Sequence, residues 1–143
     1  MTWSNLKHSI LAVLGVCGSW IAYMLGGWDT ALTTLLIIMV IDYATGVMVA
    51  IVGKSGKTDT GGLNSRAGFE GLFKKIAILL AVLLGAALDR ALGGTEQARD
   101  VVILFFSANE ALSVVENFGL LGVPFPEKLL SILEQLKSKE KIK

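Results

Sequence analysis

Three apolar runs, each long enough to cross a lipid bilayer, constrain this chain more than any other feature. The hydrocarbon core of a bilayer is about 30 Å thick, so a helix that crosses it needs roughly 20 apolar residues. Runs at 9–27, 31–53 and 76–94 meet this requirement, and a weaker fourth run covers 101–123. A mean hydropathy of +0.65 is higher than soluble domains usually reach. The sequence therefore predicts one all-α integral membrane domain over 1–143, with four transmembrane helices.

Composition argues against several classes of function. Cys17 is the single cysteine and His8 the single histidine, so an internal disulfide and a cysteine–histidine metal cluster are excluded. A net charge of +1 gives no strongly basic surface for a nucleic acid. The stretch GKSGKT at 53–58 resembles the end of a phosphate-binding loop, but Ile51 stands where the motif needs its first glycine. We therefore expect no enzyme, no cofactor, no metal and no nucleic-acid partner.

Basic residues indicate the orientation of the chain. The loop at 54–75 and the tail at 126–143 are rich in lysine, whereas the two other connections carry little positive charge. Positively charged segments remain on the cytoplasmic side, so we expect both termini and the long loop inside. The loop's basic residues are expected to contact anionic lipid headgroups, at about 1 kcal/mol each. They are Lys54, Lys57, Arg66, Lys74 and Lys75.

Two further segments are predicted to be amphipathic helices at the membrane surface. The stretch FEGLFKK, 69–75, is expected to lie as a short interfacial helix before the third span. In the tail, leucines recur at helical spacing opposite charged residues. We expect this C-terminal amphipathic helix to lie on the membrane or to pair with other copies of the chain.

Several polar residues fall inside the predicted spans, where an ionisable group is a functional candidate by default. Each charge costs roughly 2.5–3.5 kcal/mol at the centre of an inserted helix, so it is expected to face another helix, another copy or water. These interhelical or pore-lining candidates are Asp42, Asp89, Arg90, Asn109, Glu110, Ser113, Glu116 and Asn117. Gly46, Ala50 and Gly53 give the second span a flank of small residues for close helix packing. Arg90 is the expected counter-charge for Asp42, Asp89 or Glu110.

These polar faces allow two interpretations. They close on one another inside a compact bundle and specify its packing, or they meet across subunits and line a water-filled interior once enough copies gather. The number of polar positions at similar depth favours the second interpretation, a homo-oligomer in the lipid bilayer.

Four spaced stretches carry a resemblance to a known family. IDYATGVMVAIVG, LNSRAGFEGLFKK, LDRALG and NEALSVVENFGLLGVPFPEKL occur in this order between about 42 and 136. Together they resemble the toxin-secretion/phage-lysis holin family of small phage and bacterial membrane proteins. The resemblance implies a multi-pass protein of the bacterial cytoplasmic membrane that oligomerises and opens lesions, which release a cell-wall hydrolase or a toxin. Members are often drawn with three spans, so 101–123 is also open to interpretation as a re-entrant or interfacial helix.

Two other functions remain open at this point. A small ion channel or transporter subunit would use the same buried carboxylates to bind a cation or a proton. A structural membrane subunit would recruit partners through its basic loop and tail, and it would neither leak nor kill cells.

Overall fold

The structure of the chain, a computed structural model, describes residues 3–58, 60–94 and 97–139. Within these ranges all regular structure is helical, as five α-helices. They are α1 (Trp3–Met24), α2 (Thr30–Ile51), α3 (Ser65–Ala91), α4 (Gln97–Leu121) and α5 (Glu127–Lys139). The first four are long and apolar enough to cross a membrane. The all-α fold with four potential spans is therefore confirmed, including the weakest of the predicted spans.

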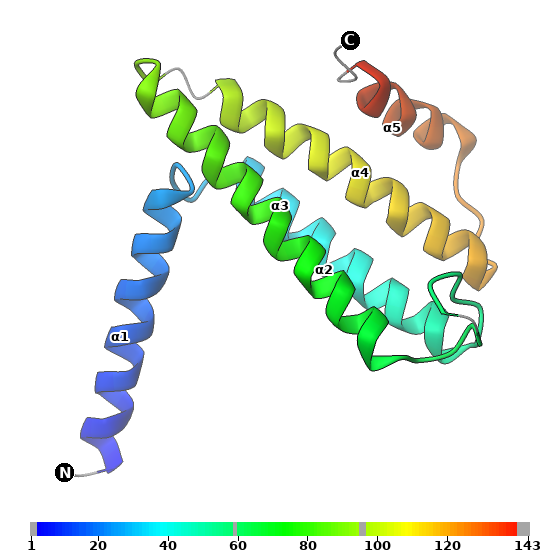
Figure 1. Cartoon of the computed structure of the whole chain (residues 1–143), viewed down its shortest axis with the longest axis horizontal. Helices are drawn as coiled ribbons and strands as arrows, with labels where there is room; N and C mark the ends of the chain where they lie inside the picture. Colours follow the sequence, from blue (N-terminus) through cyan, green and yellow to red (C-terminus); the bar gives the residue numbers. More distant parts are fainter. Residues whose placement is uncertain (1–2, 59, 95–96, 140–143) are drawn as a thin grey trace.

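Helices α2, α3 and α4 form a bundle, and α1 stands apart from it (Figure 1). The core of the bundle is apolar near its α1 end. Its buried members are Leu25, Leu32, Leu35, Met39, Ile78, Val82 and Ile103. No residue of α1 is buried, and most of its surface is apolar. A helix of this kind inserts by its own hydropathy and needs no protein partner to do so.

Two helices of the bundle begin at local side-chain caps. Asp29 accepts a hydrogen bond from the Leu32 amide at 2.8 Å at the start of α2, and Asn64 accepts one from the Arg66 amide at 2.8 Å at the start of α3. Such caps satisfy amides that have no partner within the helix.

Helix α4 is capped from a different helix. The Asp89 carboxylate, near the end of α3, accepts hydrogen bonds from the Ala98 and Arg99 amides, both at 2.9 Å. A negative charge at a helix N-terminus is also favoured by the helix dipole. Asp89 thus couples the end of α3 to the beginning of α4.

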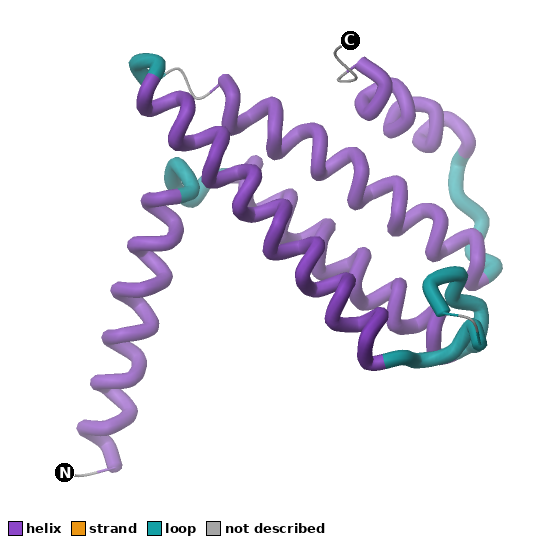
Figure 2. Tube along the Cα trace, in the orientation of Figure 1, coloured by secondary structure: helices purple, strands orange, loops and turns teal. Residues whose placement is uncertain are grey.

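Helix α3 begins earlier than the predicted third span at 76. Its cap, Asn64, places residues 65–75 in the helix, so the FEGLFKK stretch forms early turns of α3. At 1.5 Å per residue the 27 residues of α3 extend about 40 Å, more than the bilayer core. The loop between α2 and α3 is correspondingly shorter than predicted (Figure 2). As a result, Lys75 is a buried residue of α3 inside the bundle and does not belong to the loop.

The predicted C-terminal amphipathic helix forms as α5, which folds back beside α4 (Figure 1). The rings of Phe118 and Phe125 stack with centroids 6.0 Å apart across the turn between these helices. Leu130 is half-buried, whereas Leu129 and Ile132 remain exposed. The helix therefore contacts α4 of its own chain and leaves apolar surface uncovered.

One glycine sets the close approach of α3 to α4. A Cβ atom on Gly85 would lie 2.9 Å from Arg99 Cα and 3.1 Å from the Ala98 carbonyl oxygen. Backbone atoms cannot yield as a flexible side chain can. Only glycine fits at this point without moving one helix, which is the usual role of small residues between membrane helices.

We expect Gly85→Ala to destabilise the bundle by about 1–3 kcal/mol, because overpacking forces the two backbones apart. Thermal unfolding in detergent micelles measures this. Gly18→Ala in α1 is the matched control, since its Cβ would have nothing within 4 Å. An equal response of the two variants would contradict the close-packing assignment.

Candidate functional site: a buried ion cluster between three helices

The most unusual feature of the bundle is a lysine buried between two carboxylates from different helices. Lys75 of α3 donates a hydrogen bond to Asp42 Oδ2 of α2 at 2.7 Å and another to Glu110 Oε2 of α4. Glu110 is 0% exposed, and Asp42 and Lys75 are each 8% exposed. One ammonium group therefore joins all three helices of the bundle. We call Asp42, Lys75 and Glu110 the ion cluster.

Neighbouring polar groups complete the environment of Asp42. Asn117 of α4 donates to Thr45 Oγ1 at 2.9 Å and, over 3.4 Å, to Asp42 Oδ1 and to the Asp42 carbonyl. Thr45 in turn donates to the Ile41 carbonyl oxygen at 2.9 Å. Asn117 thus links α4 to α2 a second time, two turns from Glu110. These contacts satisfy both oxygens of the Asp42 carboxylate.

Glu110 is less completely satisfied. Its Oε1 atom is buried and has no hydrogen-bond partner among the described atoms. The Lys74 ammonium, whose side chain is 58% exposed, lies 3.6 Å from this atom. Counting this second lysine, two carboxylates face two ammonium groups, so the local charge is balanced. This charge balance depends on Lys74, whose side chain is partly exposed.

The energetics of the ion cluster follow from its burial. A charge at membrane depth costs several kcal/mol unless it is paired. Pairing with good geometry offsets much of this cost, whereas removing one partner leaves an uncompensated charge and costs about 3–5 kcal/mol. The ion cluster thus favours the arrangement in which all three helices remain together. Anything that separates one helix must supply water or another partner to the exposed charges.

A second polar group lies at the opposite end of the bundle, around Arg99 at the start of α4. Arg99 is 1% exposed. It donates to the Leu25 carbonyl at 2.6 Å, to Asp29 Oδ2 at 2.6 Å and to Asp100 Oδ1 at 3.2 Å. It also donates to the Gly27 carbonyl at 3.2 Å. Arg99 therefore fixes the turn between α1 and α2 against the beginning of α4.

The geometry of that turn requires glycine. Gly26 has φ +89°, and a Cβ there would lie 2.6 Å from Arg99 Cδ. The sequence analysis did not single out Arg99, because this residue falls in the short connection between the predicted third and fourth spans. One weak indication was present in the sequence. A basic residue at the start of a helix is disfavoured by the helix dipole, so a specific partner for it is expected.

The hydrogen bond from Arg99 lowers the pKa of Asp29 below its ordinary value of 3.8, against the opposing effect of burial. The Leu32 amide and the charge of Arg99 act in the same direction. Asp29 lies in the connection before α2, outside the spanning helices. The pair of Asp29 with Arg99 therefore stabilises the fold at every pH at which the Asp29 carboxylate is ionised.

The prediction that Arg90 is the counter-charge for Asp42, Asp89 or Glu110 is wrong. Arg90 donates to the Tyr23 carbonyl oxygen and, at 3.0 Å, to that of Met24, and it stacks over the Tyr23 ring with its guanidinium carbon 5.2 Å from the centroid. It therefore satisfies carbonyl groups at the C-terminus of α1, where a cation is favoured. Lys75 is the counter-charge instead.

The remaining predicted polar positions differ in their surroundings. Asp89 caps α4, as described above, and Asn109 and Ser113 are half-buried on α4. Glu116 is exposed on the surface of the same helix. The structure thus gathers Asp42, Glu110 and Asn117 at one place and leaves Asp89, Arg90 and Glu116 outside it.

The three small residues predicted to lie along one side of α2 also differ in their surroundings. Gly46 is half-buried, and a Cβ there would lie 3.8 Å from Asn117 Nδ2, so it faces α4. Ala50 is half-buried one turn further on. Gly53 lies beyond the helix with φ +72° and ends it.

The five basic residues expected at lipid headgroups have different partners. For Lys75 the expectation is wrong, because the side chain is buried in the ion cluster. Lys54 donates to the Leu120 carbonyl at 3.0 Å, and Arg66 pairs with Glu70 on the surface at 3.1 Å. Lys57 and Lys74 line a cavity of about 100 Å³ between the loop, α2 and α3.

The arrangement shows no set of groups suited to a metal. Among the described residues, no three His, Cys, Asp or Glu side chains come close enough to hold an ion.

Comparison with known proteins identifies the same family that the four spaced stretches of the sequence resemble. The bacteriophage holin family matches residues 19–138, which include the ion cluster and all of α2, α3 and α4. This chain belongs to the bacteriophage holin family. It is accordingly a holin-type, multi-pass protein of the cytoplasmic membrane, in a family of membrane proteins that are not enzymes.

Curated relatives cover nearly the whole chain. An uncharacterised 14.9 kDa protein of Clostridium perfringens is 40% identical over 136 residues, 94% of this chain and 95% of that protein. An uncharacterised protein of Clostridium acetobutylicum is 36% identical over 119 residues, 82% of this chain and 90% of its own length. One from Listeria monocytogenes is 37% identical over 128 residues, 90% and 84% of the two chains. No solved structure matches this chain.

We expect Lys75→Met to destabilise the bundle by about 3–5 kcal/mol, because it leaves two buried carboxylates without their shared cation. Thermal unfolding in micelles measures the loss. Adding Asp42→Asn and Glu110→Gln to this variant removes the uncompensated charges and should recover much of the stability.

The control for the lysine variant is Arg66→Gln, which breaks only an exposed ion pair and is expected to cost less than about 1 kcal/mol. If Lys75→Met were as stable as this control, the ion cluster would not hold the bundle together.

Because the Asp29 pKa is lowered, its contribution to stability is complete above 3.8 and is lost as the pH falls through that value towards the lower pKa of the folded state. The variant Asp29→Asn keeps a capping side chain but loses the charge. We expect it to unfold at a lower temperature than the wild type at neutral pH, with the difference narrowing in strong acid. A difference that stays constant with pH would exclude the charged pair with Arg99 as its cause.

Proposed function

We propose that this chain is a holin that accumulates in the bacterial cytoplasmic membrane, assembles with copies of itself and opens lesions there. The lesions would release a cell-wall hydrolase, or an exported toxin, from the cytoplasm. The observation that carries the proposal is the match to the bacteriophage holin family over residues 19–138. The ion cluster supplies a physical basis for it.

The first requirement of such a protein is that a single copy leaves the membrane intact. In the bundle, the charges of Asp42, Lys75 and Glu110 are paired with one another and buried. The exposed surface of the spanning helices is largely apolar, as lipid requires, with Leu80, Leu84 and Val40 among its members. A dilute copy therefore offers water no path along these groups.

The second requirement is that crowded copies open a path for water. Separating α4 from α2 and α3 would expose Glu110, Asp42 and Asn117 together on polar helix faces. That state is unfavourable in lipid but is stabilised when neighbouring copies and water surround it. Glu116, an exposed acid on a spanning helix, is proposed to face a neighbouring copy or the lesion.

We further propose that both termini and the loop between α2 and α3 lie on the cytoplasmic side. The bundle brings this loop next to the end of α4, where Lys54 contacts the Leu120 carbonyl. Basic residues are concentrated at this end of the bundle, in agreement with the positive-inside rule.

Inducible expression in bacteria tests the proposal, with membrane potential and release of a cytoplasmic enzyme followed over time. We expect an abrupt loss of potential together with enzyme release. A small, selective ion conductance without protein release would instead favour an ion channel. Normal growth with no leak would favour a structural subunit.

The substitutions Glu110→Gln and Asp42→Asn should each advance the onset of lysis at equal expression, because they weaken the contacts that hold the closed bundle. A weakening of about 1.4 kcal/mol raises the open population roughly tenfold. Glu70→Gln, an exposed acid at the start of α3, serves as the matched control. Unchanged timing in both buried variants would refute a role for the ion cluster in opening.

A further inference from the structure

Two adjoining cavities lie where the loop between α2 and α3 folds over those helices. The inner cavity has a volume of about 100 Å³, and the outer one, which is more open, about 450 Å³. Five lining residues belong to both cavities: Tyr43, Val47, Leu63, Asn64 and Gly68. The two cavities therefore adjoin along these shared residues, with the smaller one on the inside and the larger one on the outside.

The inner cavity is lined by groups that recognise an oxyanion. Lys57 and the hydroxyl-bearing Ser55 come from the loop, and Lys74 comes from α3. The Asp42 carboxylate also lines the cavity, but its charge is paired with that of Lys75. Ammonium groups and hydroxyls are the donors that bind phosphate oxygens. A volume of about 100 Å³ is that of roughly three liquid water molecules. It suits a compact charged group rather than a large ligand.

The loop that closes this cavity is folded tightly onto itself. The Ser55 amide donates to the Gly61 carbonyl at 2.9 Å, and the Thr58 hydroxyl donates to the Gly62 carbonyl at 3.0 Å. Gly61 has φ +69°, and a Cβ there would lie 2.2 Å from the Gly53 carbonyl oxygen. The positions of Ser55, Lys57 and Thr58 are thus set by the backbone before any ligand arrives.

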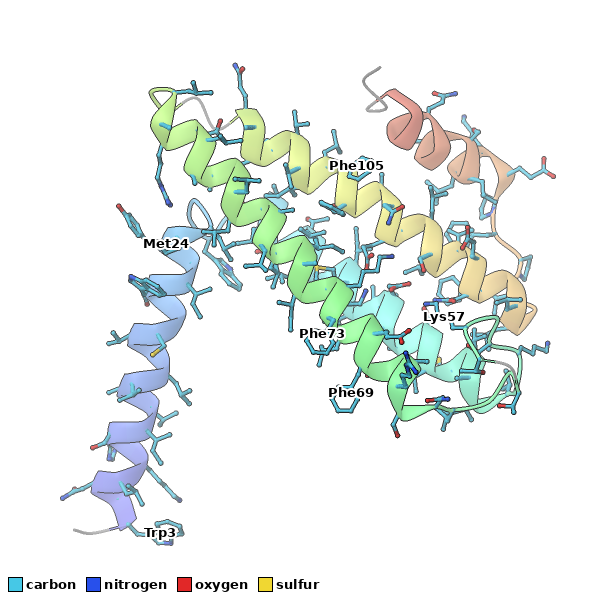
Figure 3. The ribbon with its side chains drawn as sticks, in the orientation of Figure 1. Trp3, Met24, Lys57, Phe69, Phe73 and Phe105 are labelled. Carbon is cyan, nitrogen blue, oxygen red and sulfur yellow. The ribbon has the colours of Figure 1, made fainter. Side chains whose placement is uncertain are left out.

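The outer cavity has a different chemistry. Tyr43, Val47, Leu63, Phe69 and Leu72 give it a mainly apolar lining. Phe69 is 63% exposed and Leu72 is 48% exposed, on the surface of a helix that spans the membrane. Figure 3 shows Phe69 pointing outward from α3 and Lys57 at the loop end of the bundle. The outer cavity therefore opens towards the hydrocarbon of the surrounding lipid.

We propose that this pair of cavities binds one anionic phospholipid. Its phosphate lies in the inner cavity against Lys57 and Lys74, and one acyl chain lies along the apolar outer cavity. The end of the spanning helices, where the site lies, is the level of the lipid headgroups. A phosphate group joined to a long apolar chain matches both parts of the site, whereas a free phosphate matches only the inner one.

The site adjoins the ion cluster, because Asp42 and Lys75 line the inner cavity together with Lys74. The ammonium group of Lys74 lines the inner cavity and also lies 3.6 Å from Glu110 Oε1. A bound phosphate therefore shares this lysine with the buried carboxylate. This binding site goes beyond the proposed lesion-forming function, and its test measures lipid binding alone.

The test is native mass spectrometry of the purified full chain, titrated with phosphatidylglycerol or with phosphatidylcholine of the same acyl chains. We expect one tightly bound phosphatidylglycerol per chain, preferred over phosphatidylcholine by roughly 30-fold, the effect of two lysines near a lipid charge. The double variant Lys57→Gln/Lys74→Gln should lose this preference. Lys7→Gln/Lys128→Gln removes the same charge from exposed positions elsewhere and should keep it.

A second variant tests the apolar part of the site. A Cβ on Gly68 would make only an ordinary contact, 3.8 Å from the Tyr43 hydroxyl, so the backbone accepts a side chain there. The larger side chain of Gly68→Leu extends into the region where the two cavities adjoin. We expect it to weaken phosphatidylglycerol binding at least as much as the loss of one lysine. Thermal unfolding of each variant establishes that the bundle is intact.

Three results would overturn the proposal: equal binding of the two lipids by the wild type, preference retained in the lysine variant, or preference lost equally in the charge-matched control. Competition by millimolar glycerol phosphate as effective as that by the lipid would assign the inner cavity to a soluble phosphate instead. A lysine variant that loses lipid but still lyses cells would leave the lesion-forming function standing.

Discussion

The buried ammonium group of Lys75, held between Asp42 and Glu110, is the interaction on which the rest of this bundle depends. It is a single charge that α2 and α4 both need and that α3 supplies. In lipid there is no water to solvate either carboxylate, so the alternatives to this contact are costly. Apolar side chains alone give membrane helices little preference for one another over lipid, because both are equally apolar. The ion cluster therefore specifies which three helices associate and at what register.

The same contact makes the bundle suited to a change of state. A purely apolar bundle would gain no favourable contacts by opening. Helices that carry buried charges can exchange their polar contacts within one chain for contacts with water and with other chains. Glu110 is the least satisfied member of the ion cluster, because its second oxygen relies on Lys74, which is partly exposed. A ligand or a neighbouring copy that engages Lys74 would act directly on that weakest point. Pairing in a single copy and the proposed opening in an assembly would thus depend on the same few residues.

Hydropathy predicted the four spans, and charge at membrane depth predicted Asp42, Glu110 and Asn117 as interhelical groups, since both rules act locally. The counter-charge could not be assigned in this way. Lys75 follows Lys74 in what reads as a basic loop, and only the early start of α3 at its Asn64 cap carries it into the bundle. Arg90 is the basic residue within the predicted third span, but it donates to carbonyl groups at the end of α1. Arg99 and Gly85 depend on a close approach of α3 to α4 that no local pattern encodes.

The central claim is that the polar face beside the ion cluster is dry in the closed bundle and wet once lesions open. Ser113, half-buried on α4 near Asp42, allows a direct measurement, because Cys17 is the natural chain's single cysteine. In a Cys17→Ser background, Ser113→Cys is labelled in living cells with a water-soluble maleimide, and Lys57→Cys in the loop reports entry of the reagent into the cytoplasm. The account predicts no labelling of position 113 before lysis and rapid labelling at its onset. Lysis that proceeds while position 113 stays unlabelled, although position 57 reacts, would contradict it.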